Sequence, residues 1–173
     1  MKIALRDITV ELRNPKVSDG SSLWRLVRDT GMLDLNSPYA YFLLGEHFAE
    51  TSVVAEKDGG IAGFVSAYIP PQTPDSIFVW QVGVATSMRQ QGLALKMLLA
   101  ILRRDICKNI QTLKTTITPS NTASRALFSS LAKRVNGSLH EQQDYFRSAW
   151  FPDSRHEAEA LFSISPIRLP TTQ

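Results

Sequence analysis

The sequence predicts an α/β protein in which β-strands and amphipathic helices follow one another along the chain. Three observations support this fold class. An apolar, β-branched run at residues 77–84 leads through a short polar turn into a helix that begins near Gly92. Two further strand-like runs, 51–56 and 61–69, flank Lys57-Asp58-Gly59-Gly60, which is typical of a β-hairpin turn. With 43% apolar residues, the chain can also supply the core that such a fold buries.

The N-terminal part of the chain predicts one strand and two helices. Ser18 or Asp19 can cap the first helix, and Ser37 followed by proline is a strong start signal for the second. We therefore expect, in order, a strand at 8–12, a helix that ends before Gly31, a connector at 32–36, and a helix from 39 to about 50.

The C-terminal part predicts a strand, a helix and a last hairpin. Asn121 or Thr122 can cap the helix. The expected elements are a strand at 112–118, the capped helix, hairpin strands at 139–148 and 159–164, and a loose tail from about 166 to 173. The whole order is then βααβββαβαββ, within a single domain over residues 1–173.

The turn before the helix at Gly92 predicts an anion site. A helix that starts directly after a strand directs unpaired backbone N–H groups, and the positive end of its dipole, at whatever lies above the strand end. Gly92 lets an anion approach the main chain because it has no Cβ, Ala94 keeps a second position small, and Arg89 adds a fixed positive charge. The turn is a candidate phosphate site; as a bare pattern it also fits a tight connection.

Composition argues against several other classes of protein. The net charge of +3 is spread along the chain, which argues against a nucleic-acid-binding stripe and suits a phosphate-rich cofactor equally well. The single cysteine, Cys107, excludes an internal disulfide and a Cys-based zinc site, so we expect a packed thiol and no metal. No apolar run approaches membrane-spanning length, and the N-terminus lacks the apolar core of a signal peptide, so we expect a cytoplasmic protein without a membrane partner.

The pattern Arg/Gln-x-x-Gly-x-Gly/Ala, found here at 89–94, resembles motif A of the Gcn5-related N-acetyltransferase (GNAT) superfamily. The resemblance implies a mixed, mostly antiparallel twisted sheet with splayed central strands, flanked by helices. It also implies acetyl-CoA as cosubstrate, with the pantetheine arm paired to the backbone near Val82 and Val84, and an oxyanion donor at the backbone N–H near Val82. The Asn121 amide could bond the same arm, although a helix cap explains this residue nearly as well. The pyrophosphate would lie on Arg89, Gln90, Gln91, Gly92, Leu93 and Ala94.

Four strings, at 33–41, 78–82, 118–128 and 156–162, resemble the family of L-2,4-diaminobutyrate acetyltransferases of ectoine synthesis. This resemblance implies acetylation of the γ-amine of diaminobutyrate, a homodimer, and a role in osmotic adaptation. The chain departs from the family at two places. These are Gln91-Gly92-Leu93-Ala94, where Arg-Gly-x-Gly is more frequent, and Asp153-Ser154-Arg155, where the family tends toward glycine.

The diaminobutyrate resemblance implies a locally acidic pocket, because this substrate carries two ammonium groups near neutral pH. The candidates are Asp34, Glu157 and Glu159, each of which could fix the α-ammonium or accept the proton shed by the γ-amine. His156 could serve as a base or an orienting group.

Aromatic residues complete the candidate site. Trp80 could form a wall for the aliphatic stem of the substrate, or be buried against a helix. Tyr39 is a second substrate candidate, and helical spacing puts at least one of Tyr39 and Tyr41 in the core. Many GNAT enzymes reprotonate the thiolate with a Tyr where this chain has Phe128, so the proton must come from Tyr145, a water or the ammonium product.

Three rival functions remain open at this stage. The chain could acetylate another small amine, such as a polyamine or an antibiotic amino group. It could be a non-catalytic coenzyme A sensor that keeps only the phosphate turn. A nucleic-acid module is the most distant alternative, and it predicts steeply salt-dependent binding.

Overall fold

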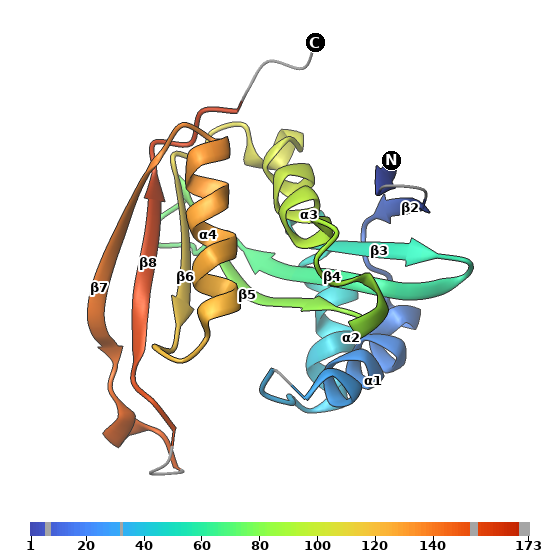
Figure 1. Cartoon of the computed structure of the whole chain (residues 1–173), viewed down its shortest axis with the longest axis horizontal. Helices are drawn as coiled ribbons and strands as arrows, with labels where there is room; N and C mark the ends of the chain where they lie inside the picture. The colour runs from blue at the N-terminus through green and yellow to red at the C-terminus, as the bar shows by residue number, and fades with distance from the viewer. Residues whose placement is uncertain (6–7, 32, 153–155, 170–173) are drawn as a thin grey trace. The chain divides into compact units, whose positions relative to one another are not determined.

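The structure is a computed structural model that describes residues 1–5, 8–31, 33–152 and 156–169. The chain forms two compact units (Figure 1). The first comprises Met1–Tyr68 and Val79–Lys108, and the second comprises Ile69–Phe78 and Asn109–Gln173. Three parts of the sequence predictions lie outside the described residues: Met32 of the connector, the string Asp153-Ser154-Arg155, and the end of the tail at 170–173.

Helices and strands follow one another in the predicted order, except that an extra strand stands at the start. The bounds are β1 Lys2–Leu5, β2 Ile8–Arg13, α1 Gly20–Thr30, α2 Pro38–His47, β3 Val53–Lys57, β4 Gly60–Tyr68, β5 Ser76–Val84, α3 Leu93–Leu102, β6 Thr112–Ile117, α4 Thr122–Arg134, β7 Ser138–Phe146 and β8 Glu159–Ser165. The described strands pair in the order β1-β2-β3-β4-β5-β6-β8-β7. The expected mixed, mostly antiparallel sheet flanked by helices is therefore confirmed.

The extra strand, β1, precedes the first strand that the sequence predicts. It has four residues, of which Leu5 is buried. It pairs antiparallel with β2, from Lys2 opposite Glu11 to Leu5 opposite Ile8. So short a run carries little periodicity of its own, and backbone pairing with β2 accounts for its extended conformation.

The first unit is an antiparallel sheet with helices on both faces. β3 and β4 form the predicted hairpin, with Lys57 opposite Gly60. In Figure 1, α1 and α2 lie on one face of β3 and β4, and α3 lies on the other. A core cluster fills the space under α1 and α2; its buried members are Leu23, Val27, Tyr41, Leu44, Val54 and Phe64. Burying such side chains stabilises the unit by about 1.5–3 kcal/mol each.

The Asp19 carboxylate does not cap α1, although the sequence predicted Ser18 or Asp19 in that role. Asp19 stands at the start of α1, but its side chain accepts two hydrogen bonds from the Arg13 guanidinium, at 2.7 and 2.9 Å. It also accepts the backbone N–H of Lys16 at 2.7 Å. Arg13 donates to Glu56 as well. The guanidinium holds the pKa of Asp19 below its usual range, although burial opposes this shift.

The Asp19 pair predicts a pH-dependent stability. Because the pKa of Asp19 is lower in the folded protein, its contribution is full above the unfolded value of about 3.9 and is lost as pH falls through the folded pKa. Asp19→Asn should lower the free energy of unfolding at pH 7 by about 2 kcal/mol. Urea titrations from pH 7 to pH 3 should show this difference shrinking below about pH 4. A constant difference over the whole range would contradict the role of the ionised pair.

The second unit holds the parallel pair and the final hairpin. Ser76–Phe78 of β5 pair in parallel with Thr112–Lys114 of β6, and β5 continues beyond this ladder to Val84. β8 pairs antiparallel with β6 and with β7, as expected for a closing hairpin. The Arg125 guanidinium of α4 lies 4.9 Å from the centre of the Phe162 ring of β8.

The described part of the C-terminal tail is held in place rather than loose. Ile167 donates its backbone N–H to Gln111 at 3.0 Å, and Arg168 donates to Val135 at 2.8 Å. The sequence expectation is therefore wrong at these two residues. It failed because both acceptors lie far away in the sequence.

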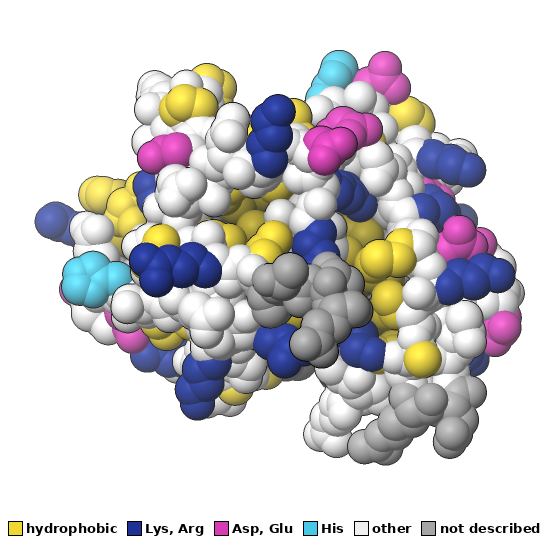
Figure 2. Space-filling view, turned by 90° about the horizontal axis from the view of Figure 1, so that it is seen from above, with side chains coloured by type: hydrophobic (Ala, Val, Ile, Leu, Met, Phe, Trp, Pro, Cys, Tyr) yellow, Lys and Arg dark blue, Asp and Glu magenta, His cyan; other side chains and the backbone are white. Residues whose placement is uncertain are grey.

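The described surface carries charges of both signs. Figure 2 shows Lys and Arg side chains at separate places on one face, with Asp and Glu side chains among them. Cys107 is buried, as expected for a packed thiol. Within the described residues, we find no helix with the length and apolar character needed to cross a membrane.

Candidate active site

The turn between β5 and α3 has the backbone geometry of an anion cradle. A short 3-10 turn at Thr86–Met88 follows β5, and Gln90 (φ 60°) and Gly92 (φ 75°) then take left-handed conformations. α3 begins at Leu93, immediately after Gly92. The first backbone N–H groups of a helix have no acceptor within it. They follow Gly92 directly, and Gly92 adopts its left-handed conformation freely because it has no Cβ.

The electrostatics of this turn favour an anion. Residues 86–96 contain no acidic side chain, and the exposed Arg89 donates through Nε to the carbonyl of Val84 at 3.4 Å. Gln91 donates to the carbonyl of Ser87 at 3.2 Å, while its Oε1 is buried and accepts no hydrogen bond from the described residues. The donor set therefore fits a pyrophosphate: helix N–H groups, an arginine and the positive end of a helix dipole.

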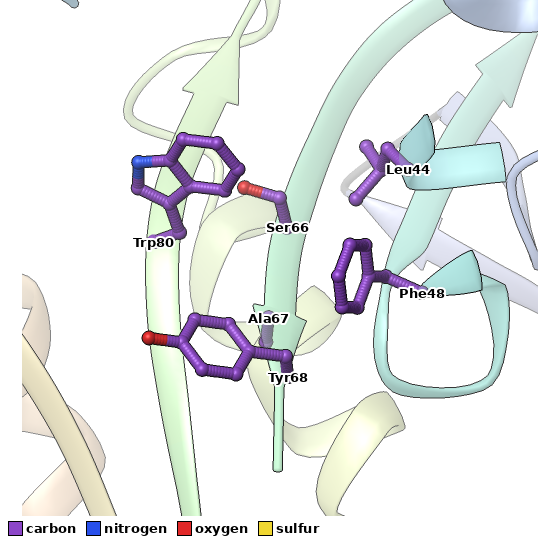
Figure 3. Close-up of a pocket in the computed structure, with 6 residues that line it drawn as sticks. All are labelled: Leu44, Phe48, Ser66, Ala67, Tyr68 and Trp80. Atoms are coloured by element: carbon purple, nitrogen blue, oxygen red, sulfur yellow. The ribbon is translucent and has the colours of Figure 1, made fainter. Parts of the chain in front are cut away.

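Trp80 lies on β5 upstream of this turn and lines a pocket. Its side chain is 50% exposed, so the alternative of burial against a helix is wrong. Figure 3 shows Trp80 of β5 at one end of the pocket and Leu44 and Phe48, from α2 and the residue after it, at the other, with Ser66 and Tyr68 of β4 between them. The pocket holds about 340 Å³ of empty space, part of it open to solvent. Trp80 thus presents an aromatic wall within the first unit.

Asp34 of the connector and Tyr39 in the first turn of α2 are both exposed. Ser37 caps α2 as predicted, accepting the N–H of Tyr39 at 3.3 Å. Tyr39 is 65% exposed and Tyr41 is buried, which confirms that one of the two tyrosines belongs to the core. Burial raises the pKa of the Tyr41 phenol, against the effect of its hydrogen bonds, so it remains a donor.

Gln81 joins this connector to β5, a role that sequence reasoning missed. Its amide donates to the backbone carbonyl of Asp34 at 2.9 Å and accepts from the Tyr41 hydroxyl at 3.3 Å. The signal was present, because a Gln inside an otherwise apolar strand needs buried partners. The structure thus brings Asp34 to the strand that carries Trp80, Val82 and Val84.

In the second unit, Asn121 and Glu157 both lie near the start of α4. Asn121 is the predicted helix cap, and its Oδ1 accepts the N–H of Ser124 at 3.0 Å. The exposed Glu157 carboxylate accepts hydrogen bonds from the hydroxyl and the backbone N–H of Ser120. Glu157 is therefore held beside the residue that precedes the Asn121 cap.

His156 of the same unit lies close to both Glu157 and Glu159. Its ring stacks on Phe151, with centroids 3.7 Å apart, and its Nδ1 lies 2.6 Å from the carbonyl oxygen of Glu157. Because a carbonyl oxygen only accepts, Nδ1 carries the proton in this contact, and the lone pair of the neutral ring is on Nε2. Nε2 faces the carboxylate of Glu159 at 3.9 Å. This arrangement suits a base held in one tautomer.

Phe128 and Tyr145 differ in their access to solvent. Phe128 is buried on α4, whereas Tyr145 is partly exposed on β7 and lies beside Phe146, with ring centroids 4.8 Å apart and the rings tilted by 55°. Phe128 offers no proton. The exposed phenol of Tyr145 keeps its place among the possible proton sources.

The mixed sheet and the anion-binding turn define the class of this protein, an N-acetyltransferase of the GNAT type. The profile described as the acetyltransferase (GNAT) family matches residues 22–132. The chain is 47% identical over 161 residues to the L-2,4-diaminobutyric acid acetyltransferase of Halalkalibacterium halodurans, covering 93% of this chain and 84% of the relative. It is 49% identical over 153 residues to that of Marinococcus halophilus, covering 88% of each. The chain belongs to the GNAT family and, within it, to the L-2,4-diaminobutyric acid acetyltransferases.

A solved structure supports the same assignment. The diaminobutyrate acetyltransferase EctA of Paenibacillus lautus, in complex with its substrate L-2,4-diaminobutyric acid and coenzyme A, is 42% identical to this chain. The match has a TM-score of 0.89 and covers 95% of this chain and 99% of that protein.

Proposed function

We propose that this protein transfers the acetyl group of acetyl-CoA to the γ-amine of L-2,4-diaminobutyrate, giving N4-acetyl-L-2,4-diaminobutyrate. The observation that carries the proposal is the match to the Paenibacillus lautus enzyme, whose structure contains both diaminobutyric acid and coenzyme A. The anion-binding turn supports the cofactor, since its N–H groups, Gly92 and Arg89 suit a pyrophosphate.

The reaction needs a neutral amine held near the thioester carbonyl. The amine nitrogen attacks the carbonyl carbon, a C–N bond forms, the C–S bond breaks, and the thiolate takes up a proton. We propose that the backbone N–H near Val82 stabilises the developing oxyanion. In this proposal Val82, Val84 and Asn121 hold the pantetheine arm, and the pyrophosphate lies on Arg89, Gln90, Gln91, Gly92, Leu93 and Ala94.

This proposal keeps the substrate candidates of the sequence analysis, each within its own unit. The first unit supplies Asp34, Tyr39 and Trp80. The second supplies Glu157 and Glu159 as acidic groups, and His156 as the base that takes the proton from the γ-ammonium. The Nδ1 contact supports the last role because it leaves the lone pair on Nε2.

The wider setting of the proposal rests on the family. We propose a cytoplasmic homodimer that acts in ectoine synthesis during osmotic stress, with the whole chain working as one acetyltransferase domain. The GNAT match from 22 to 132 supports the last point, because it includes residues of both compact units.

The test is an acetylation assay with purified protein, acetyl-CoA and a panel of amines. Released coenzyme A is measured with a thiol reagent, and burial, which raises the pKa of Cys107 to about 11, keeps the native protein's own thiol from reacting. We expect the highest kcat/KM with diaminobutyrate, and NMR of the product should place the acetyl group on the γ-nitrogen. Turnover of another diamine with none of diaminobutyrate would overturn the substrate. Coenzyme A binding without turnover of any amine would indicate a sensor.

A further inference from the structure

Gln81 is a buried polar residue in the middle of the central strand β5. Its side chain makes the two hydrogen bonds described above, to the Asp34 carbonyl and the Tyr41 hydroxyl. Its backbone N–H is also taken by a side chain, since it donates to Ser66 Oγ at 3.0 Å. Both the main chain and the amide of Gln81 are therefore anchored by groups from other elements.

The connector at 33–36, to which Gln81 is hydrogen bonded, and the start of α2 are otherwise largely exposed. Asp34, Leu35, Ser37 and Tyr39 all lie at the surface. Leu33 of this stretch packs against the core cluster. Hydrogen bonds add to this contact: the Gln81 amide donates to the carbonyl of Asp34, and the Tyr41 phenol is hydrogen bonded with Asn36. Because Tyr41 also donates to Gln81, the two hydrogen bonds belong to one network.

The position of Gln81 in the strand gives this network a functional meaning. Gln81 lies between Trp80, which forms an aromatic wall, and Val82, whose backbone we assign to the oxyanion. The hydrogen bond from Gln81 to the backbone carbonyl of Asp34 holds this part of the connector beside β5. The exposed Asp34 carboxylate is thereby kept near the strand at which we place acetyl transfer. Holding groups in such a register is worth more to a reaction than to the stability of the fold.

We infer that Gln81 is a positioning residue for the amine substrate: it locks the Asp34 connector to β5 and so sets where the acidic group meets the amine. The inference rests on the proposed function for the identity of the amine. It assigns Gln81 no contact with substrate and no chemical step.

The test compares Gln81→Met, which keeps the length and packing of the side chain but not its hydrogen bonds, with the wild type. Losing the hydrogen bond to the Asp34 carbonyl should raise KM for diaminobutyrate about tenfold, the usual effect of one lost hydrogen bond. KM for acetyl-CoA should stay within about twofold of the wild-type value. Tyr41→Phe should move the same constant in the same direction. In the double variant, KM for diaminobutyrate should rise by less than the product of the two single effects, because both residues act in one network.

A matched control separates positioning from general loss of stability. Ser52→Ala removes another fully buried hydroxyl of the first unit, whose partner is the backbone of Ala67. It should cost a similar free energy of unfolding and leave both KM values unchanged. Equal changes of KM in Ser52→Ala, or none in Gln81→Met, would overturn the inference.

Limited proteolysis tests whether Gln81 holds the connector to β5, and it does not depend on any activity. Chymotrypsin cleaves after Leu and aromatic residues, and Leu35 of the connector and Tyr39 at the start of α2 are exposed. Cleavage there should accelerate severalfold in Gln81→Met and in Tyr41→Phe but not in Ser52→Ala. Unchanged cleavage in both variants would overturn the inference even if diaminobutyrate is the substrate. If cleavage is faster in the variants but the wild-type enzyme prefers another amine, only the proposed substrate is overturned. The kinetic comparison is then made with KM for that amine. If Gln81→Met does not fold, Tyr41→Phe decides both measurements.

Discussion

Replacing Gly92 by alanine is expected to raise KM for acetyl-CoA by tenfold or more. Gly92 has φ 75°, where a side chain costs about 1 kcal/mol, and its neighbours leave open space around an added Cβ. The backbone can relieve that strain by rotating, which turns the N–H groups at the start of α3 away from the anion. Initial rates at varied acetyl-CoA concentration, with the amine saturating, measure the effect.

The chain supplies a closely matched control in Gly59. This glycine has φ 76°, lies exposed in the β3–β4 hairpin, and also has open space where a Cβ would stand. Gly59→Ala should therefore lose about the same stability as Gly92→Ala, with a melting temperature a few degrees below that of the wild type. Its KM for acetyl-CoA should not change. If both variants bind acetyl-CoA like the wild type, the pyrophosphate does not lie on this turn.

The anion-binding turn was predictable because its determinants are local. A strand, a polar turn with glycine and an apolar helix follow one another within 77–102, and each is specified by its own side chains. The caps Ser37 and Asn121 were predictable for the same reason, since each bonds a backbone N–H two or three residues ahead. The β3–β4 hairpin follows from its turn residues alone.

Features that depend on distant partners were not predictable in this way. Asp19 looked like a helix cap, but Arg13 and the backbone of Lys16 compete for its oxygens in the folded chain. Gln81 interrupted an apolar strand visibly, yet its partners lie 40 and 47 residues away. The exposure of Trp80 likewise depends on which of its neighbours leave a pocket open. A single sequence gives residue types at such positions but not their contacts.

The sequence alone did not distinguish the acidic candidates Asp34, Glu157 and Glu159. In the structure, Glu157 and Glu159 differ in exposure and in their partners. Glu157 is exposed and already engaged by Ser120, whereas the Glu159 side chain is only 19% exposed and faces Nε2 of His156. A sheltered carboxylate interacts more strongly with a cation than a solvated one does, because water screens it less. Glu159 is therefore the acidic group of the second unit whose charge should matter most for an ammonium substrate.

Glu159→Gln is expected to lower kcat/KM for diaminobutyrate by about 30-fold or more, the effect of removing one partner from a sheltered charge pair. KM for acetyl-CoA should change by less than about twofold, since the anion-binding turn is untouched. Glu157→Gln should have a smaller effect, because its carboxylate is exposed.

The control for Glu159 is Glu141→Gln in the same unit. Glu141 is a partly buried carboxylate of β7 that pairs with Arg125 at 2.9 Å, so its loss costs stability through a charge pair that belongs to the fold. Its kinetic constants should match those of the wild type. If Glu159→Gln behaves like Glu141→Gln, the charge of Glu159 serves the fold rather than the amine. If Glu157→Gln has the larger effect, the exposed carboxylate near the start of α4 is the one that binds the substrate, and the pairing of Glu159 with His156 is structural.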